Sequence, residues 1–318
     1  MKLLTLKSEK HYSAGVLIGK EALDFTAVSE ILEAKGEWVK GEPQLDSFRK
    51  LEGIYKDALD LLIWEPGWAS RTIARIEADS LLLQECRDKR ALVPVSDAVL
   101  GPPVTSPGKI LAVGLNYAAH ARETNAKLPE SPLIFSKCTT ALVGPGENIR
   151  LPRISDKVDY EGELAVIIGK QATSVKAENA YEYVAGYSIM NDVTARDLQR
   201  REHQWVRAKG LDTFAPCGPW LVTRDEIPDP NNLDIELRVN GEIRQRSNTS
   251  DLIFKIPQLI EFITQDLTLR PGDIITTGTP SGVGFTMEPP IFLKAGDLIE
   301  ITIEKIGTLL NSVVGPQG

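Results

Sequence analysis

The chain has 318 residues, of which 42% are hydrophobic and 25% are charged, and this mixture is typical of a globular protein. The composition excludes collagen-like, coiled-coil and wholly disordered classes, and the length favours two domains or one large domain with an appendage. Lysine and arginine number 36 against 44 acids, a net charge of −8. This balance argues against a general nucleic-acid or anionic-membrane binder, although a local basic pocket stays open.

The three cysteines, Cys86, Cys138 and Cys217, have no CxxC spacing. Neither a disulfide framework nor a zinc cage is therefore indicated, and a reducing cytoplasm is the predicted location. The first twelve residues lack an apolar stretch long enough for a secretory signal, and nowhere do 18 apolar residues run together. We expect neither export nor a membrane span.

The first hundred residues have helix-like apolar spacing at residues 25–34, stopped by Gly36, and again at 45–64. Residues 99–108 (VLGPPVTSPG) are rich in Pro, Gly and Ser, which form helices and strands poorly, and we place a boundary there. The expected organisation is a small α+β N-terminal domain over residues 1–100 and a second domain over residues 101–318.

The second domain is predicted to be β-rich. Its short, β-branched segments are bounded by Gly, Pro, Asn or Asp and lie at residues 109–113, 164–168, 233–239, 273–277 and 298–303. Asn240-Gly241 between two such segments is a strong hairpin signal, because both residues readily adopt positive φ. Helical patterns recur at residues 191–201 and 256–265.

The sharpest local feature is an acidic run, DYEGE, that leads directly into the apolar segment LAVII. On a strand, Glu161 and Glu163 would point the same way with Asp159 behind them, so their charges would repel strongly. A divalent ion bound by carboxylate oxygens would remove that repulsion, and an all-oxygen set favours Mg²⁺, Mn²⁺ or Ca²⁺ over zinc. On this pattern alone, a solvated acidic edge strand is the stronger interpretation.

A further acid begins the predicted helix 191–201, where Asp192, Arg196 and Gln199 stand at i, i+4 and i+7 and would share one face. Asp192 would then complete a metal site while Arg196 and Gln199 bind an anionic, oxygen-rich ligand. The segment alone favours the simpler interpretation of a helix cap and a surface ion pair.

His120 is followed three residues later by Glu123, so the two side chains can meet on a helical turn. A carboxylate beside an imidazole fixes its tautomer and raises its basicity, which suits a base that activates water. A hydrogen-bonded surface or capping histidine is the equally weighted alternative.

Two other features suit anion binding. Residues 276–284 (TTGTPSGVG) are Gly-rich but lack the Gly-Lys-Ser/Thr ending of a phosphate loop, so nucleotide binding is disfavoured. The backbone N–H groups and the Thr279 hydroxyl could still bind a carboxylate, with a plain turn as the alternative. Lys209 could neutralise an oxyanion, although a solvated lysine is the default expectation.

Five motifs occur in order: GLNYAAHARE, DYEGELAVIIG, GYSIMNDVTARDLQ, AKGLDTFAPCGPWLVT and TTGTPSGVGF. Together they resemble the fumarylacetoacetate hydrolase family over residues 109–307. The resemblance is to its shorter members, and the GPWLVT and VNGEIRQ segments are similar to the branch of acylpyruvate and diketo-deoxy-sugar-acid hydrolases. It implies a β-rich roll, a mixed β-sandwich or barrel, as the C-terminal catalytic domain. It also implies a homodimer.

The resemblance assigns roles to residues. Mg²⁺ or Mn²⁺ would be bound by Glu161, Glu163 and Asp192. His120 and Glu123 would form a catalytic dyad on a mobile segment, and Lys209 would be the active-site lysine. Substrate would be bound by Arg196, Gln199 and Thr279.

The implied substrate is a small 2-oxo acid, and the leading expectation is a metal-dependent hydrolase. It would cleave a C–C bond of an acylpyruvate or 2,4-diketo acid through an enolate and release pyruvate or a related 2-oxo acid. The same residues would serve an oxaloacetate-type decarboxylase or an isomerase or tautomerase of 2-hydroxy-diene-dioates. A non-catalytic metal or carboxylate binder is the alternative from a different class.

Overall fold

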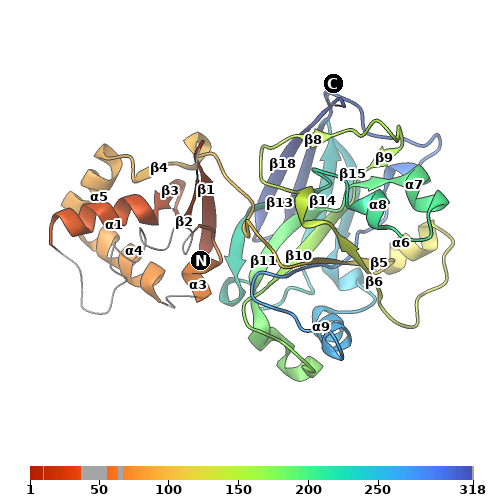
Figure 1. Cartoon of the computed structure of the whole chain (residues 1–318), viewed down its shortest axis with the longest axis horizontal. Coiled ribbons are helices and arrows are strands. Elements are labelled where there is room, and N and C mark those ends of the chain that lie inside the picture. Colours follow the sequence, from red (N-terminus) through yellow and green to blue (C-terminus); the bar gives the residue numbers. More distant parts are fainter. Residues whose placement is uncertain (10, 37–55, 64–66, 317–318) are drawn as a thin grey trace. The chain divides into compact units, whose positions relative to one another are not determined.

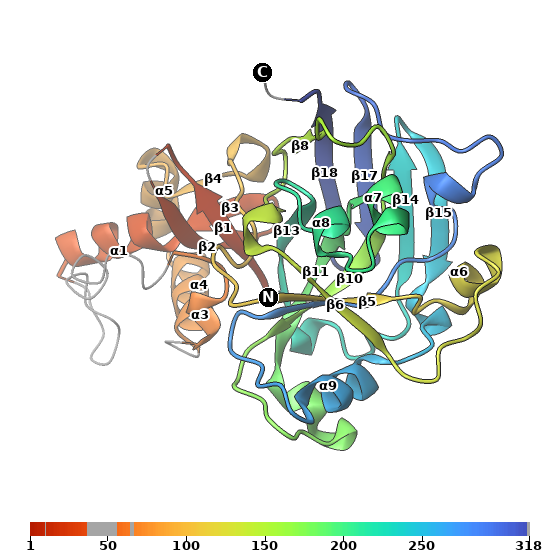
Figure 2. The same cartoon turned by 45° about the vertical axis from the view of Figure 1, so that its right-hand side comes forward.

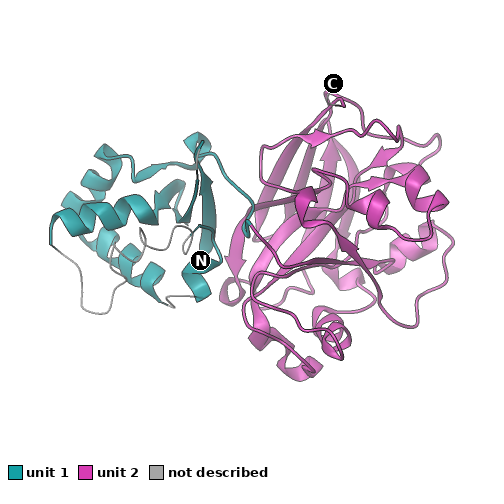
Figure 3. Cartoon of the chain, viewed as in Figure 1, with its two compact units in different colours: residues 1–105 teal, residues 106–318 magenta. Residues whose placement is uncertain are grey.

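The computed structural model describes residues 1–9, 11–36, 56–63 and 67–316. The chain divides into two compact units, residues 1–105 and 106–318 (Figure 3). The division falls inside the Pro- and Gly-rich stretch 99–108. That the first unit folds as a domain of its own stays a prediction.

The first unit is a small antiparallel sheet with helices. Its strands follow the order β4-β3-β2-β1, namely β4 (Leu92–Pro94), β3 (Glu21–Asp24), β2 (Tyr12–Ile18) and β1 (Lys2–Lys7). Its described helices are α1 (Phe25–Ala34), α3 (Asp60–Ile63), α4 (Trp68–Ala78), α5 (Ser80–Asp88) and the short η1 (Val95–Asp97). Helix α1 has the predicted bounds: the Asp24 carboxylate accepts hydrogen bonds from the Thr26 and Ala27 N–H groups, and Gly36 follows with a φ of 65°. Most of the helix predicted at 45–64 lies outside the described residues, which there include only α3 and its flanks.

The second unit is built on a mixed sheet with the order β13-β11-β10-β16-β5-β6 (Figures 1 and 2). Its strands are β13 (Ala215–Thr223), β11 (Val184–Asn191), β10 (Gly162–Ile168), β16 (Ile274–Thr276), β5 (Ile110–Gly114) and β6 (Leu133–Lys137), and β7 (Leu142–Val143) pairs with β13. Every residue of β10 is buried, as its unbroken apolar run predicts for a central strand. The predicted strands at 109–113, 164–168 and 273–277 are thus neighbours.

A second sheet packs against the first with the order β15-β14-β17-β18-β8, comprising β15 (Glu242–Asn248), β14 (Asp234–Val239), β17 (Leu298–Ile303), β18 (Gly307–Val314) and β8 (Ile149–Arg150). A Cβ on Gly162 of β10 would lie 3.2 Å from Ile301 and 3.3 Å from Leu237 of this sheet, so the two layers meet closely there. The predicted Asn240-Gly241 hairpin joins β14 to β15 with φ of 54° and 79°.

Short helices and strands surround these sheets: α6 (Ala118–Glu123), η2 (Thr139–Ala141), β9 (Val158–Asp159), η3 (Ala177–Tyr183), β12 (Thr194–Ala195), α7 (Arg196–Arg201), α8 (Val206–Lys209), η4 (Arg224–Glu226), η5 (Thr249–Asp251), α9 (Ile256–Thr264) and η6 (Gly284–Thr286). The fold is α+β with a β-rich two-sheet roll, as expected. In the described part of the chain neither sheet closes into a barrel, so only the sandwich half of that expectation holds. None of the described helices is long and apolar enough to cross a membrane.

Candidate active site

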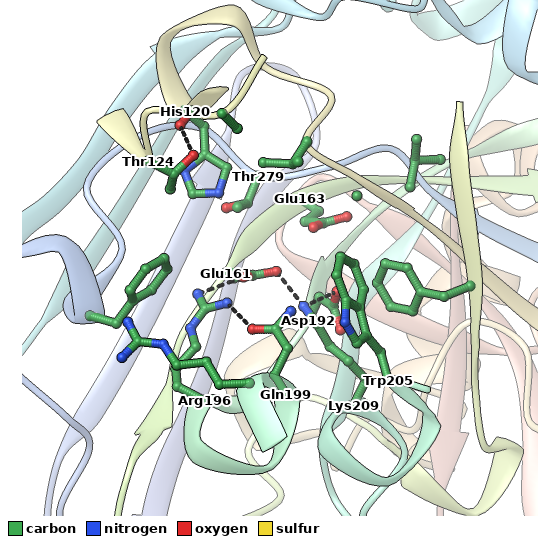
Figure 4. Close-up of a pocket in the computed structure, with 17 residues that line it drawn as sticks. His120, Thr124, Glu161, Glu163, Asp192, Arg196, Gln199, Trp205, Lys209 and Thr279 are labelled. Carbon is green, nitrogen blue, oxygen red and sulfur yellow. Dashed lines mark hydrogen bonds and ion pairs between the residues drawn. The ribbon is translucent and has the colours of Figure 1, made fainter. Parts of the chain in front are cut away.

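A cavity of about 310 Å³ in the second unit brings most of the predicted site residues together (Figure 4). Its lining comes from β5 and the residues after it, α6, β6, the start of β10, the end of β11, α7, α8 and the loop after β16. The lining residues are Val113, Gly114, Leu115, His120, Thr124, Ala126, Phe135, Glu161, Glu163, Asp192, Arg196, Gln199, Arg200, Trp205, Lys209, Thr279 and Phe285. Of the predicted set, only Glu123 is not part of this lining.

Three buried carboxylates form the floor of the cavity. Glu161 and Glu163 lie on either side of Gly162 at the start of β10. Gly162 pairs with Asn191 of the neighbouring strand β11, and Asp192 is the next residue after Asn191. One oxygen from each carboxylate lies within 4.8 Å of the others. The antiparallel register therefore brings together acids that are 29 to 31 residues apart in sequence.

Asp192 does not stand on a helix, so the predicted helical face with Arg196 and Gln199 is wrong. Its N–H donates to the Glu161 carbonyl oxygen at 2.8 Å, and β12 then pairs with β9, which keeps the backbone extended until α7 begins at Arg196. The β-branched Val193 and Thr194 favour this extended path and were the available signal. The three side chains still reach one cavity.

Asp159 lies apart from the three carboxylates, contrary to the simple alternation of the acidic run. Strand β9 ends at Asp159 and β10 begins only at Gly162, so the alternation is interrupted. The Asp159 carboxylate instead accepts hydrogen bonds from Arg196 Nε at 2.8 Å and from the N–H groups of Gly284 and Phe285. It ties α7 to the loop that follows β16.

Three buried cations offset part of the negative charge. Lys209 Nζ lies 2.6 Å from Glu161 and 2.7 Å from Asp192, and Arg196 lies 2.6 Å from Glu161. Burial opposes ionisation of Glu161, but Lys209 and Arg196 outweigh it and lower the pKa of that carboxyl. Burial would also lower the pKa of Lys209, but the negative charges of Asp192 and then Glu161 outweigh it and raise that pKa.

Lys137 is the third cation, and its sequence context did not predict a place in the site. Its Nζ lies 2.5 Å from Asp192 Oδ1 and also donates to the Lys209 carbonyl oxygen. Burial lowers the pKa of Lys137 in spite of the Asp192 charge. A lysine at the end of a predicted strand has no sequence mark that separates it from a solvated one, so only the fold identifies it.

Glu163 differs from its neighbours because no cation is within ion-pairing distance of it among the described residues. Its carboxylate accepts hydrogen bonds from the Thr276 hydroxyl at 2.5 Å and the Gly278 N–H at 2.8 Å. Burial, then the charges of Asp192 and Glu161, raise the pKa of Glu163. Glu163 is therefore the carboxylate of the cluster whose ionised form is disfavoured and that no cation of the described residues pairs with.

The predicted dyad is present as a hydrogen-bonded pair. His120 Nδ1 lies 3.0 Å from Glu123 Oε2 on α6, and His120 lies on the opposite side of the carboxylates from α7 in Figure 4. Glu123 Oε1 also accepts from the Gly282 N–H and the Thr286 hydroxyl, each at 2.9 Å. Burial opposes ionisation of Glu123, but these hydrogen bonds outweigh it and lower the pKa of its carboxyl group. With Nδ1 engaged, Nε2 is the ring nitrogen left for a ligand in the cavity.

The Gly-rich loop binds carboxylates of the protein itself. The N–H groups of Gly278, Gly282 and Gly284 donate to Glu163, Glu123 and Asp159 respectively. The Thr279 hydroxyl donates to the Gly162 carbonyl oxygen and accepts from Gln245 at 2.8 Å. The hydroxyl proton of Thr279 is thus engaged, and its predicted contact with substrate stays a prediction.

The chain matches the fumarylacetoacetate (FAA) hydrolase C-terminal family over residues 109–314, which is more than half of its length. The protein belongs to this family of enzymes. It is 45% identical over 267 residues to the oxaloacetate tautomerase Fahd2a, mitochondrial, of Rattus norvegicus, an alignment that covers 82% of this chain and 85% of the relative.

Two solved structures resemble the whole chain. One is the 5-carboxymethyl-2-hydroxymuconate delta-isomerase of Mycobacterium smegmatis, 35% identical with a TM-score of 0.71. The other is the maleylpyruvate hydrolase of Sphingobium sp. SYK-6 in complex with manganese(II) and pyruvate, 32% identical with a TM-score of 0.74. Both alignments cover 100% of each chain.

Proposed function

We propose that this protein is a divalent-metal-dependent tautomerase that interconverts the enol and keto forms of a 2-oxo acid of the oxaloacetate type. The observation that carries the proposal is the placement of one hydrogen-bonded histidine, His120, across a small cavity from three buried carboxylates. The similarity to an oxaloacetate tautomerase over most of the chain supports the choice of reaction. A cavity of about 310 Å³ is at the lower end of ligand-site volumes, which suits a small acid.

The donor set fits a divalent cation. Glu161, Glu163 and Asp192 offer only carboxylate oxygens, which Mg²⁺ and Mn²⁺ prefer, and Glu163 is the one of the three that forms no ion pair with a described residue. When bound, such an ion would stabilise the negative charge that develops on a 2-oxo oxygen as the keto form loses a proton. Ca²⁺ satisfies the same donor chemistry.

His120 would carry the proton. Tautomerisation of a 2-oxo acid removes a proton from the carbon next to the carbonyl group and adds one to the carbonyl oxygen, so no bond between heavy atoms breaks. Glu123 holds His120 Nδ1, and the Nε2 atom would take up the proton and return it. The bonds from Gly282 and Thr286 fix Glu123 in turn, so the ring has one orientation.

The residues of α7 and α8 would orient the substrate. Lys209 Nζ supplies positive charge beside the carboxylates. Arg196 Nη1 donates to Gln199 Oε1 at 3.0 Å, which leaves the Gln199 amide NH₂ as a donor for a carboxylate ligand. Arg196 acts here mainly by positioning Gln199 and Glu161.

The test is a direct assay of enol disappearance. Freshly dissolved enol oxaloacetate is mixed with protein and Mn²⁺, and its ultraviolet absorbance is followed while pyruvate release is measured in parallel. We expect loss of the enol signal, faster than in buffer, with no matching release of pyruvate. Enol decay at the buffer rate would overturn the proposal.

Hydrolysis of an acylpyruvate is the second candidate, and the His120–Glu123 pair favours it because the same base could deprotonate water. The similarity to a maleylpyruvate hydrolase supports it also. Acylpyruvates of increasing chain length, assayed for pyruvate release with Mn²⁺, separate the two candidates. Pyruvate from acylpyruvates without enol turnover of oxaloacetate would favour the hydrolase, and carbon dioxide from oxaloacetate would favour the decarboxylase alternative.

A further inference from the structure

One cationic side chain that lines the cavity is not ion-paired with the carboxylate cluster. Among the cations that line it, Lys209 is paired with Glu161 and Asp192, and Arg196 with Asp159 and Glu161. Arg200 also lines the cavity, but no carboxylate of the described chain lies within ion-pairing distance of its guanidinium. This cation is therefore available to a ligand.

The position of Arg200 follows from the helix that carries it. Arg196 and Arg200 are four residues apart on α7, so both stand on one face, about 6 Å apart along the axis. Arg196 contacts Glu161 of the carboxylate cluster, whereas Arg200 lines the same cavity and forms no ion pair with the cluster. A short-chain acid with one end at the cluster would direct its other end toward Arg200.

Phe285 holds this side chain in place. Its ring lies 5.5 Å from the Arg200 guanidinium and 4.3 Å from that of Arg196, and its N–H donates to Asp159. Stacking on a ring whose backbone is anchored limits the freedom of an otherwise exposed arginine. Less conformational entropy is then lost when the guanidinium binds an anion.

We infer that Arg200 binds the second carboxylate of the substrate and so selects 2-oxo dicarboxylic acids over monocarboxylic ones. The inference rests on the proposed function for its substrate class. Arg200 is a specificity-determining residue in this account, because a guanidinium binds a carboxylate in a bidentate, charge-assisted manner while proton transfer occurs at the opposite end of the molecule.

The experiment compares two unreactive acids that differ by one carboxylate. Malate and lactate share a 2-hydroxy acid end, and only malate has a second carboxylate. Their dissociation constants are measured by calorimetry on the Mn²⁺-loaded full chain for the wild type, Arg200→Met, Arg200→Lys and Arg201→Met. Arg201 is the matched control, since it follows Arg200 on α7 but does not line the catalytic cavity.

We expect wild-type protein to bind malate more tightly than lactate, and Arg200→Met to weaken malate binding about tenfold with lactate unchanged. Arg200→Lys should recover part of the loss, because it keeps the charge without the planar fork. Arg201→Met should behave as wild type. In turnover, Arg200→Met should raise KM for oxaloacetate more than it lowers kcat.

Equal binding of malate and lactate by the wild type would overturn the inference, as would a malate affinity that Arg200→Met leaves intact or that Arg201→Met lowers equally. The binding comparison needs no turnover. If Arg200→Met selectively loses malate binding but the wild type does not convert enol oxaloacetate, the proposed role of Arg200 stands and only the tautomerase proposal is rejected.

Discussion

Glu163 is the residue on which the metal proposal depends most, because it lies near Glu161 and Asp192 and is ion-paired with no cation in the described part of the chain. Glu163→Gln keeps the size and the acceptor oxygen for Thr276 and Gly278 but removes the charge. We expect Mn²⁺ affinity to fall at least about tenfold in a calorimetric titration. Unchanged affinity would mean that the three carboxylates are only an ion-paired cluster.

Asp159 provides the matched control within the same acidic run. Its carboxylate is bound by Arg196 and by the Gly284 and Phe285 N–H groups, away from the proposed ligands. Asp159→Asn should change Mn²⁺ affinity far less than Glu163→Gln, yet lower the free energy of unfolding by about 3 kcal/mol in urea, since it leaves a buried arginine without this partner. Equal loss of Mn²⁺ affinity in both variants would place Asp159 among the ligands.

His120→Ala separates the base from the metal site. The variant should keep Mn²⁺ binding, because His120 is hydrogen-bonded to Glu123 and not to the proposed ligands among the described residues, while kcat falls by about 10² to 10⁴. Glu123→Gln should lower kcat less, and the double variant should cost little beyond His120→Ala, as expected of residues that act as one unit. A wild-type kcat for His120→Ala would assign proton transfer to another group.

The sequence predicted the site residues that lie in recognisable motifs, but it did not predict Lys137, which lies outside them. Glu161, Glu163 and the His120–Glu123 pair stand close in sequence, so spacing alone brought them to notice. Lys137 is 55 residues from the Asp192 that it pairs with, and nothing local distinguishes it. Only the pairing of β10 with β11 and the path of β6 bring such residues together.

At the scale of elements, the loop after β16 connects the dyad to the carboxylate cluster. Its Gly278 donates to Glu163 and its Gly282 to Glu123, and both glycines have a φ in the left-handed region. A Cβ on Gly282, whose φ is 100°, would lie 2.0 Å from the Arg244 carbonyl oxygen, and its N–H holds Glu123. A Cβ on Gly241, whose φ is 79°, would meet nothing within 4 Å. A substitution at Gly241, in the hairpin between β14 and β15, would therefore add backbone strain alone, whereas one at Gly282 would add strain and a steric clash.

Gly241→Ala should cost about 1 kcal/mol of unfolding free energy and leave kcat unchanged, because only backbone strain is added to the hairpin. Gly282→Ala should cost more and lower kcat as well, because the loop must move and release Glu123. Urea unfolding and steady-state kinetics measure both. A normal kcat for Gly282→Ala would show that the loop does not position the dyad.

The strands were predicted better than the helices around the site, for a physical reason. Central strands such as β10 carry an unbroken apolar run, and the Asn240-Gly241 turn has few alternatives to positive φ. The predicted helix at 191–201 begins only at Arg196, because the Asp192 N–H donates to Glu161 and Thr194 pairs with Asp159 of a distant strand. Local helical spacing cannot report such partners.

At the scale of the whole molecule, the homodimer implied by the family resemblance stays a prediction, as does the cytoplasmic location. Light scattering of the full chain should give about twice its 34.9 kDa mass. A monomeric mass at micromolar concentration would reject the dimer without touching the account of the cavity, whose lining residues all belong to the second unit of one chain.

The most direct test of the central claim is the rate of enol oxaloacetate conversion by the whole protein before and after metal removal. We predict that stripping with EDTA abolishes the enzyme-dependent rate and that adding back Mn²⁺ or Mg²⁺ restores it, because Lys137, Lys209 and Arg196 are already ion-paired with the carboxylates and a divalent ion would supply the further positive charge that stabilises a developing enolate. A full rate in protein shown by elemental analysis to be metal-free would contradict it.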